Sequence, residues 1–242
     1  MTTFAYSQFL DLTNEVLEEL NEVPLTSGNF ASAIGFQLVA KNAVNKAIRD
    51  IQNQQWEWPW NHVQTTQVLT PGVPIYALPN NCRSVDWDTF FIARDDNLTS
   101  PQTATWVPQV SWDDYVQKLK PLAEQQDSSQ WAPPKAIYRT QNTEFGVYPF
   151  PDQAYTIEYE YWKTYSGLVN YNDPSSVPNL FDYVVFNGAM YYCYRFRENA
   201  MAAADAKSAF EQGIENMRNI YIIDYLKLTD MRAGPQFNQV FF

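Results

Sequence analysis

The chain has 242 residues, a net charge of −11 and a charged fraction of 18%. Its length fits one large or two small domains, whose core needs no disulfide or metal to fold. The surplus of 27 acidic over 16 basic residues repels phosphate backbones, which argues against a sequence-independent nucleic-acid binder. Aromatic residues reach 16%. Abundant Tyr and Trp favour a protein that assembles with partners, although a β-rich core would also use them.

Cysteines and targeting signals indicate an intracellular protein. Cys82 and Cys193 lie outside any C-x-x-C or Cys/His cluster, so we expect two reduced thiols rather than a zinc or redox site. The N-terminus has no basic and apolar secretory signal, and no apolar run is long enough to span a membrane. The sequon Asn97-Leu98-Thr99 is therefore interpreted as a polar loop.

The first zone of the chain has the apolar spacing of two helices. Apolar residues recur every three or four positions over residues 7–20, and again over residues 34–51. Pro24 and Gly28 lie between the two runs, as is typical of a helix connection. The pattern predicts a helix hairpin.

The second zone changes to a strand pattern. Short segments rich in β-forming residues alternate with Pro- and Asn-containing turns, and predict strands at residues 63–69, 75–78, 85–92, 136–140, 145–148 and 155–162. Alternation in the last strand places Tyr159 on one face and Glu158 and Glu160 on the other, which predicts an antiparallel sheet with a solvent-exposed face. A capping box at Ser111 predicts a short helix to about Leu119.

The third zone returns to helix. A run from Asn179 contains Gly188, which allows close helix packing. A break near Glu198 precedes a long helix to about Leu226. We predict an α+β fold in which residues 1–60 and 178–228 form a helical bundle and residues 61–177 form an inserted, β-rich domain resembling a sandwich or barrel. Residues 229–242 form an extended C-terminal tail.

The sequence contains no motif of a conventional catalytic site. His62 is the single histidine and has no nucleophile motif beside it, so a structural role is favoured. Glu158 and Glu160 resemble a glycosidase carboxylate pair, but their i, i+2 spacing on a strand favours two solvated side chains. Asp86, Asp88, Asp95 and Asp96 lack the spacing of a calcium loop, and no phosphate-binding glycine motif occurs. We predict no catalytic, cofactor or metal residues.

Two aromatic segments are candidates for interface residues. The cluster Trp56-Glu57-Trp58-Pro59-Trp60 fits a sugar-stacking platform, an interface anchor, or a plug where the chain crosses between its helical and β zones; the plug is favoured. The chain ends in an apolar, aromatic segment that cannot fold alone. The candidate interface residues are Phe237, Val240, Phe241, Phe242, Trp58 and Trp60.

The order of these elements resembles the head-to-tail adaptor proteins of short-tailed bacteriophages, the tail tubular protein A type. The similarity covers about residues 5 to 225, and each motif is weak alone. It begins with a helix hairpin whose second helix contains the Ala- and Asn-rich stretch at residues 40–50, followed by the aromatic exit at residues 56–60. A strand pair around residues 72–79 and a strand-turn-strand at residues 145–159 come next. Residues 178–192 and an Ala-rich helix at residues 200–222 complete it.

The resemblance implies a structural role in the virion rather than an enzyme. Such adaptors form a homo-oligomeric ring, commonly a dodecamer, beneath the portal protein, and their β-domain reaches toward the tail nozzle or tube protein. Double-stranded DNA passes through the shared channel without sequence-specific binding. An acidic channel would let DNA slide with little adhesion. The C-terminal segment would dock on the portal or on a neighbouring subunit.

Two other functions remain open from the sequence. An aromatic-rich carbohydrate-binding module predicts exposed, coplanar Trp or Tyr rings. A cell-envelope hydrolase predicts a cleft that pairs His62 with a carboxylate, or two carboxylates, across strands.

Overall fold

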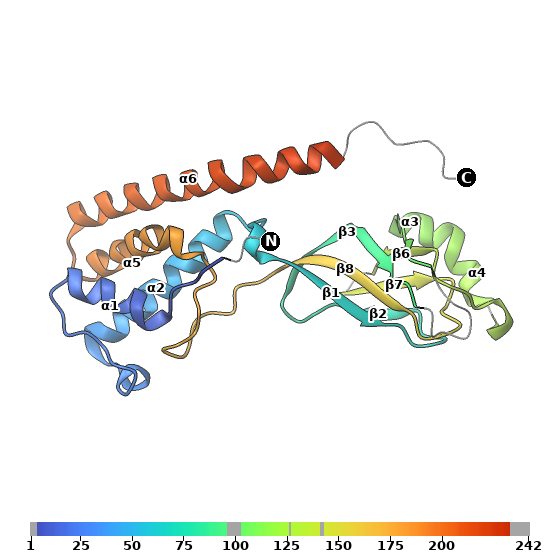
Figure 1. Ribbon diagram of the computed structural model, residues 1–242, viewed down its shortest axis with the longest axis horizontal. Coiled ribbons are helices and arrows are strands. Elements are labelled where there is room, and N and C mark those ends of the chain that lie inside the picture. Colours follow the sequence, from blue (N-terminus) through green and yellow to red (C-terminus); the bar gives the residue numbers. More distant parts are fainter. Residues whose placement is uncertain (1–3, 96–102, 126, 141–142, 233–242) are drawn as a thin grey trace. The chain divides into compact units, whose positions relative to one another are not determined.

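The computed structural model describes residues 4–95, 103–125, 127–140 and 143–232, with side chains described as far as residue 222. The chain divides into two compact units (Figure 1). The helical unit comprises Met1–Asn61 and Tyr165–Phe242, and the β unit comprises His62–Thr164. The α+β class predicted from the sequence is confirmed.

Helices from both ends of the chain pack together in the helical unit. They are α1 (Phe9–Glu19), α2 (Gly35–Gln54), α5 (Asp182–Phe196) and α6 (Ala200–Arg232). Short 3-10 turns occur at Phe30–Ser32, Pro59–Asn61 and Asn179–Phe181. Helix α5 packs against α1, α2 and α6. The predicted break falls at Glu198, whose φ is 58°, and α6 then continues beyond the predicted end to Arg232.

The core of the helical unit is formed by the predicted apolar stripes. Leu17 of α1 and Ile48 of α2 are fully buried. Gly188 allows the close packing expected of it, because a Cβ at this position would lie 2.7 Å from the Phe210 ring and 2.8 Å from the Ala47 Cβ. Cys193 is buried in the same core, and both cysteines are free thiols.

Residues 165–177 belong to the helical unit, although the sequence pattern groups them with the β-rich zone. The Asn45 side chain of α2 accepts the Leu168 backbone N–H at 2.8 Å and donates to the Leu168 carbonyl at 2.9 Å. The Phe9 N–H donates to the Asp173 carbonyl at 3.0 Å. These bonds fix an irregular segment to α1 and α2, which explains why it carries no periodic signal.

The described residues of the β unit form two four-stranded sheets. The first has the order β1-β8-β3-β4 and is antiparallel; the second has the order β2-β7-β6-β5, with β5 parallel to β6. The strands are β1 (His62–Val68), β2 (Ile75–Ala77), β3 (Cys82–Ile92), β4 (Thr105–Trp106), β5 (Gln109–Val110), β6 (Ala136–Arg139), β7 (Glu144–Tyr148) and β8 (Thr156–Lys163). All six predicted strands are present. The sequence pattern does not reveal β4 and β5 because two residues have no period.

The two sheets share one apolar core. Phe90 of β3 stacks on Tyr159 of β8, with centroids 4.7 Å apart, and both rings meet Phe145 of β7 edge-on. In β8, Ile157, Tyr159 and Tyr161 are buried while Glu158 and Glu160 are partly exposed, as the alternation predicts; Trp162 at the end of the strand is buried as well.

A short helical segment lies in the β unit, as predicted. It begins at α3 (Trp112–Asp114), continues through a π-helical turn at Tyr115–Leu119 and ends with α4 (Lys120–Glu124). Ser111 caps it, because its side chain accepts the Asp114 N–H at 3.1 Å. Tyr115 stacks on Tyr138 of β6 with centroids 3.6 Å apart. This contact attaches the helical segment to the second sheet.

Candidate functional site

Trp58 and Trp60 lie inside the helical unit rather than on its surface. Their exposed fractions are 0% and 6%. The two indoles stack with centroids 4.9 Å apart and planes 8° apart, and the Trp58 Nε1–H donates to the Ile51 carbonyl at 3.3 Å. In the isolated chain these rings therefore act as core residues.

Aromatic residues from distant parts of the sequence surround Trp60. Phe4 and Tyr221 meet it edge-on, at centroid distances of 6.1 and 5.5 Å, and Phe181 lies 6.4 Å away. The cluster thus brings together the start of the chain, the 3-10 turn after α2, the 3-10 turn before α5, and α6. The other four candidate interface residues, Phe237, Val240, Phe241 and Phe242, lie outside the described residues, as does the sequon at residues 97–99.

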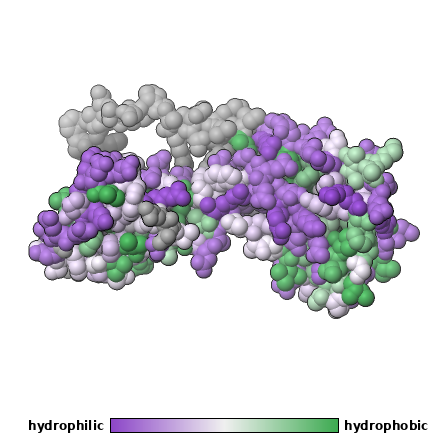
Figure 2. Space-filling model, turned by 180° about the vertical axis from the view of Figure 1, so that it is seen from behind, coloured by the Kyte–Doolittle hydropathy of each residue, from purple (hydrophilic) through white to green (hydrophobic). Residues whose placement is uncertain are grey.

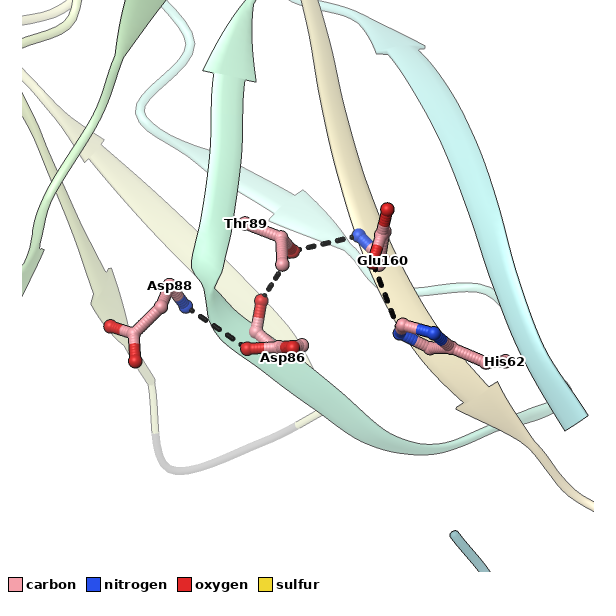
Figure 3. Close-up of polar contacts among 5 residues, drawn as sticks. All are labelled: His62, Asp86, Asp88, Thr89 and Glu160. Atoms are coloured by element: carbon pink, nitrogen blue, oxygen red, sulfur yellow. Dashed lines mark hydrogen bonds and ion pairs between the residues drawn. The ribbon is translucent and has the colours of Figure 1, made fainter. Parts of the chain in front are cut away.

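A cluster of titratable groups forms on the outward face of the first β-unit sheet. We call His62, Asp86 and Glu160 the sheet-face cluster; Figure 3 shows them on three adjacent strands. One ligand atom from each lies within 4.8 Å of the others. The His62 Nε2 is 3.2 Å from a Glu160 carboxylate oxygen, and the two side chains are 17% and 32% exposed.

Strand register explains why these three residues meet. Asp86 lies directly opposite Glu160 on β3 and β8, and Gln64 of β1 lies opposite Glu160 on its other side. His62 is two residues from Gln64 and therefore points to the same face. Side chains that are far apart in the sequence are thus adjacent on the sheet.

Thr89 holds the backbone at the centre of the sheet-face cluster. Its hydroxyl accepts the Glu160 N–H at 2.9 Å and donates to the Asp86 carbonyl at 2.6 Å. These bonds sit in a bulge, because the pairing of β3 with β8 shifts between Asp86 and Phe91. Bulges redirect side chains and are frequent near functional sites.

The sheet-face cluster supplies the residue pair that a hydrolase would need, but its placement differs from that of an enzyme cleft. It lies on the outward face of a sheet. A cavity of about 240 Å³ in the β unit is lined by Leu78, Arg83, Trp87, Arg139, Glu144 and neighbouring residues, and none of the cluster residues lines it. Cation binding is the chemistry that one imidazole and two carboxylates at this spacing support most directly.

An apolar patch lies on the helical unit, around the start of α2. We define the apolar patch as Val23, Ile34, Leu38 and Phe196, which are 73%, 78%, 44% and 61% exposed. Leu38 lies one turn after Ile34. Figure 2 shows apolar side chains gathered on this unit beside a largely polar surface.

Contacts of α2 hold two members of the apolar patch, Val23 and Phe196, beside this helix. The Gln37 side chain donates to the Val23 carbonyl at 2.9 Å, and the Phe36 ring lies 5.9 Å from Phe196. Arg197 lies over Phe36 at 4.3 Å and forms an ion pair with Glu22 at 2.5 Å. The patch therefore has a polar, charged edge, as protein interfaces commonly have. The sequence pattern does not reveal this patch. Helical spacing includes Ile34 in the apolar stripe that is expected to be buried, whereas its side chain is exposed.

Among the described residues, no helix has both the length and the apolar character that crossing a membrane requires.

Comparison with known proteins gives one family match. The family model described as SU10 adaptor protein matches residues 7–235, which span every helix and strand that the structure describes. No curated protein sequence matches the chain.

Proposed function

We propose that this chain, which belongs to the SU10 adaptor protein family, forms a ring that joins the portal to the tail nozzle or tube of a bacteriophage. Family membership makes it a structural adaptor protein of a phage. The single observation that carries the proposal is that the match extends over both units, from residue 7 to residue 235. An isolated helix hairpin or β-sandwich would carry no such inference.

The apolar patch supports an assembly role. Ile34 and Val23 each expose more than two thirds of their surface, and exposed apolar residues with a polar rim are typical of protein interfaces. We propose that this patch is buried against the portal protein or against a neighbouring adaptor subunit. Phe237, Val240, Phe241 and Phe242 would add a second contact to the same partners.

The charge of the chain is compatible with a DNA conduit. A net charge of −11 disfavours retention of double-stranded DNA, since phosphate binding requires Lys and Arg. We propose that DNA passes through the ring without sequence-specific binding. The protein would be made in the host cytoplasm, assemble into a ring of about twelve subunits, and reside in the virion at the head-to-tail junction. In this role it needs no catalytic residue.

Solution mass measurements test this proposal. The purified chain, measured by light scattering alone and after mixing with the portal of the same phage, should form a ring-sized complex with the portal. Cryo-electron microscopy of the native particle should then place the chain between portal and tail. A chain that stays monomeric with the portal, and that is absent from the head-to-tail junction, would refute the proposal.

A further inference from the structure

We propose that the sheet-face cluster of the β unit is a binding site for a divalent transition metal ion, for which Zn²⁺ is the probe. His62 Nε2, one Asp86 oxygen and one Glu160 oxygen would be the three protein ligands. A fourth position would remain for water. This site is independent of the adaptor function, and its three residues belong to one sheet of one unit.

The distances fit a metal centre. Zn²⁺ binds imidazole nitrogen and carboxylate oxygen at about 2.0–2.2 Å, which in a tetrahedral arrangement places neighbouring ligand atoms about 3.4 Å apart. The His62 nitrogen and the Glu160 oxygen already lie 3.2 Å apart. The full set falls within 4.8 Å, so the ligand atoms need to approach one another by at most about 1.4 Å to reach the tetrahedral spacing.

The electrostatics of the sheet favour a bound cation. Asp86 and Glu160 lie directly opposite each other on adjacent strands, and like charges in that position destabilise a sheet. A divalent ion bound between the two carboxylates would neutralise their charge.

The site is also held in place before any metal arrives. The His62 ring stacks on Trp162 with centroids 4.5 Å apart and planes 17° apart, which limits the directions in which its nitrogen can point. Thr89 fixes the backbone of both carboxylate residues. The Asp88 N–H approaches an Asp86 carboxylate oxygen at 3.4 Å. Such outer contacts orient metal ligands and strengthen binding.

The ion would act as a clamp across the first sheet. It would connect β1, β8 and β3, whose pairing is interrupted by the bulge after Asp86. Because a metal that binds only the folded state stabilises that state, Zn²⁺ should raise the melting temperature of the chain.

Binding of Zn²⁺ to the full chain, after chelator treatment and dialysis, tests the proposal. Isothermal titration should give about one tight site per chain, because each chain carries one set of His62, Asp86 and Glu160. His62→Gln and Asp86→Asn should each weaken binding by at least about tenfold, because even loss of an outer contact costs about 10–100-fold. Glu158→Gln is the matched control, since Glu158 shares the same face and strand but contacts Gln64 instead.

A thermal-shift series separates ligand loss from misfolding. The melting temperatures of the wild type, His62→Gln and the control are first measured without metal. These values are the baseline from which the effect of Zn²⁺ on each protein is counted. With Zn²⁺, only the wild type and Glu158→Gln should gain stability. The proposal fails if the wild type binds no Zn²⁺, or if His62→Gln and Asp86→Asn bind and stabilise as the wild type does.

Discussion

Trp58 stacks on Trp60 inside the core of the helical unit, with centroids 4.9 Å apart and planes 8° apart. Trp58→Ala removes the whole indole from a position with no exposure, so we expect a loss of about 3–5 kcal/mol in the free energy of unfolding. Urea unfolding monitored by circular dichroism measures this. Trp58→Phe keeps an aromatic partner for Trp60 and should cost clearly less. Equal stability of Trp58→Ala and the wild type would contradict the core assignment.

Gly188→Ala tests the close approach of α5 to its neighbours. The new methyl group would lie 2.7 Å from the Phe210 ring and 2.8 Å from the Ala47 Cβ, so we expect a loss of about 1–3 kcal/mol from overpacking. Gly28→Ala is the control, because its nearest atom lies 3.9 Å away. Thermal melts of the two variants should differ in this order. A neutral Gly188→Ala would show that α5 packs less tightly against α2 and α6 than these distances require.

How far the sequence predicts this fold depends on periodicity. The apolar stripe of α2 and the alternation in β8 arise from regular spacing, so residues such as Ile48 and Tyr159 are recognisable as core residues from their spacing alone. Residues 165–177 carry no period, since Asn45 and backbone bonds fix them. For Trp58 and Trp60 the sequence favours a plug at the chain crossover, and both rings lie in the core of the helical unit, shortly before its boundary at Asn61. Local sequence does not distinguish a buried ring from an exposed one.

The sheet-face cluster is beyond sequence reasoning for a topological reason. His62, Asp86 and Glu160 each belong to a different segment, and none of these segments carries a metal motif of its own. The three side chains lie close together because β8 pairs with both β1 and β3, and because a bulge interrupts the pairing of β3 with β8. No local motif predicts that bulge. The only available signal is that each residue occupies the polar face of a predicted strand or its edge.

Asp182 makes the stability of the helical unit depend on pH. Burial raises the pKa of this carboxyl above its ordinary value of 3.8, and Asp11 adds to this, while the hydrogen bond donated by Ser7 opposes it. Its Oδ1 is buried with no hydrogen-bond partner in the described part of the chain. Between pH 3.8 and the raised pKa the folded chain binds more protons than the unfolded chain, so this contribution is complete at low pH and is lost as the pH rises.

The melting temperature of Asp182→Asn minus that of the wild type should therefore increase as the pH is raised from about 4 to about 7. Asp173→Asn is a control of opposite sign. The pKa of Asp173 is lowered because its carboxylate accepts the N–H groups of Val169 and Asn170. Its contribution is present above the ordinary pKa and is lost as the pH falls, so Asp173→Asn should cost stability at about pH 7 and less at about pH 4. Parallel pH profiles for the two variants would contradict both assignments.

Ile34→Asp tests the apolar patch as an interface. Ile34 is 78% exposed and occupies the N-cap of α2, with no side-chain cap bond. Aspartate is a preferred N-cap residue, so the variant should fold at least as well as the wild type. A charge in a buried interface should still weaken ring or portal assembly by about tenfold or more, which is about 1.4 kcal/mol. Val169→Asp, at another position of the same unit that is 72% exposed, should assemble normally. Normal assembly of Ile34→Asp would exclude the patch from the interface.

Deletion of residues 231–242 tests whether the aromatic C-terminus anchors the chain on a partner. The packed side chains of α6 that define the helical core, such as Phe210 and Ile214, precede this segment, so the truncated chain should keep its melting temperature. Apolar anchors carry much of the binding energy of an interface, and co-assembly with the portal should therefore be lost or strongly reduced in sedimentation. Replacing Phe237, Phe241 and Phe242 by Ser keeps the length of the chain and should reproduce the defect, because the lost contacts are the aromatic rings. Unchanged portal assembly in both variants would assign the contact to the folded units alone.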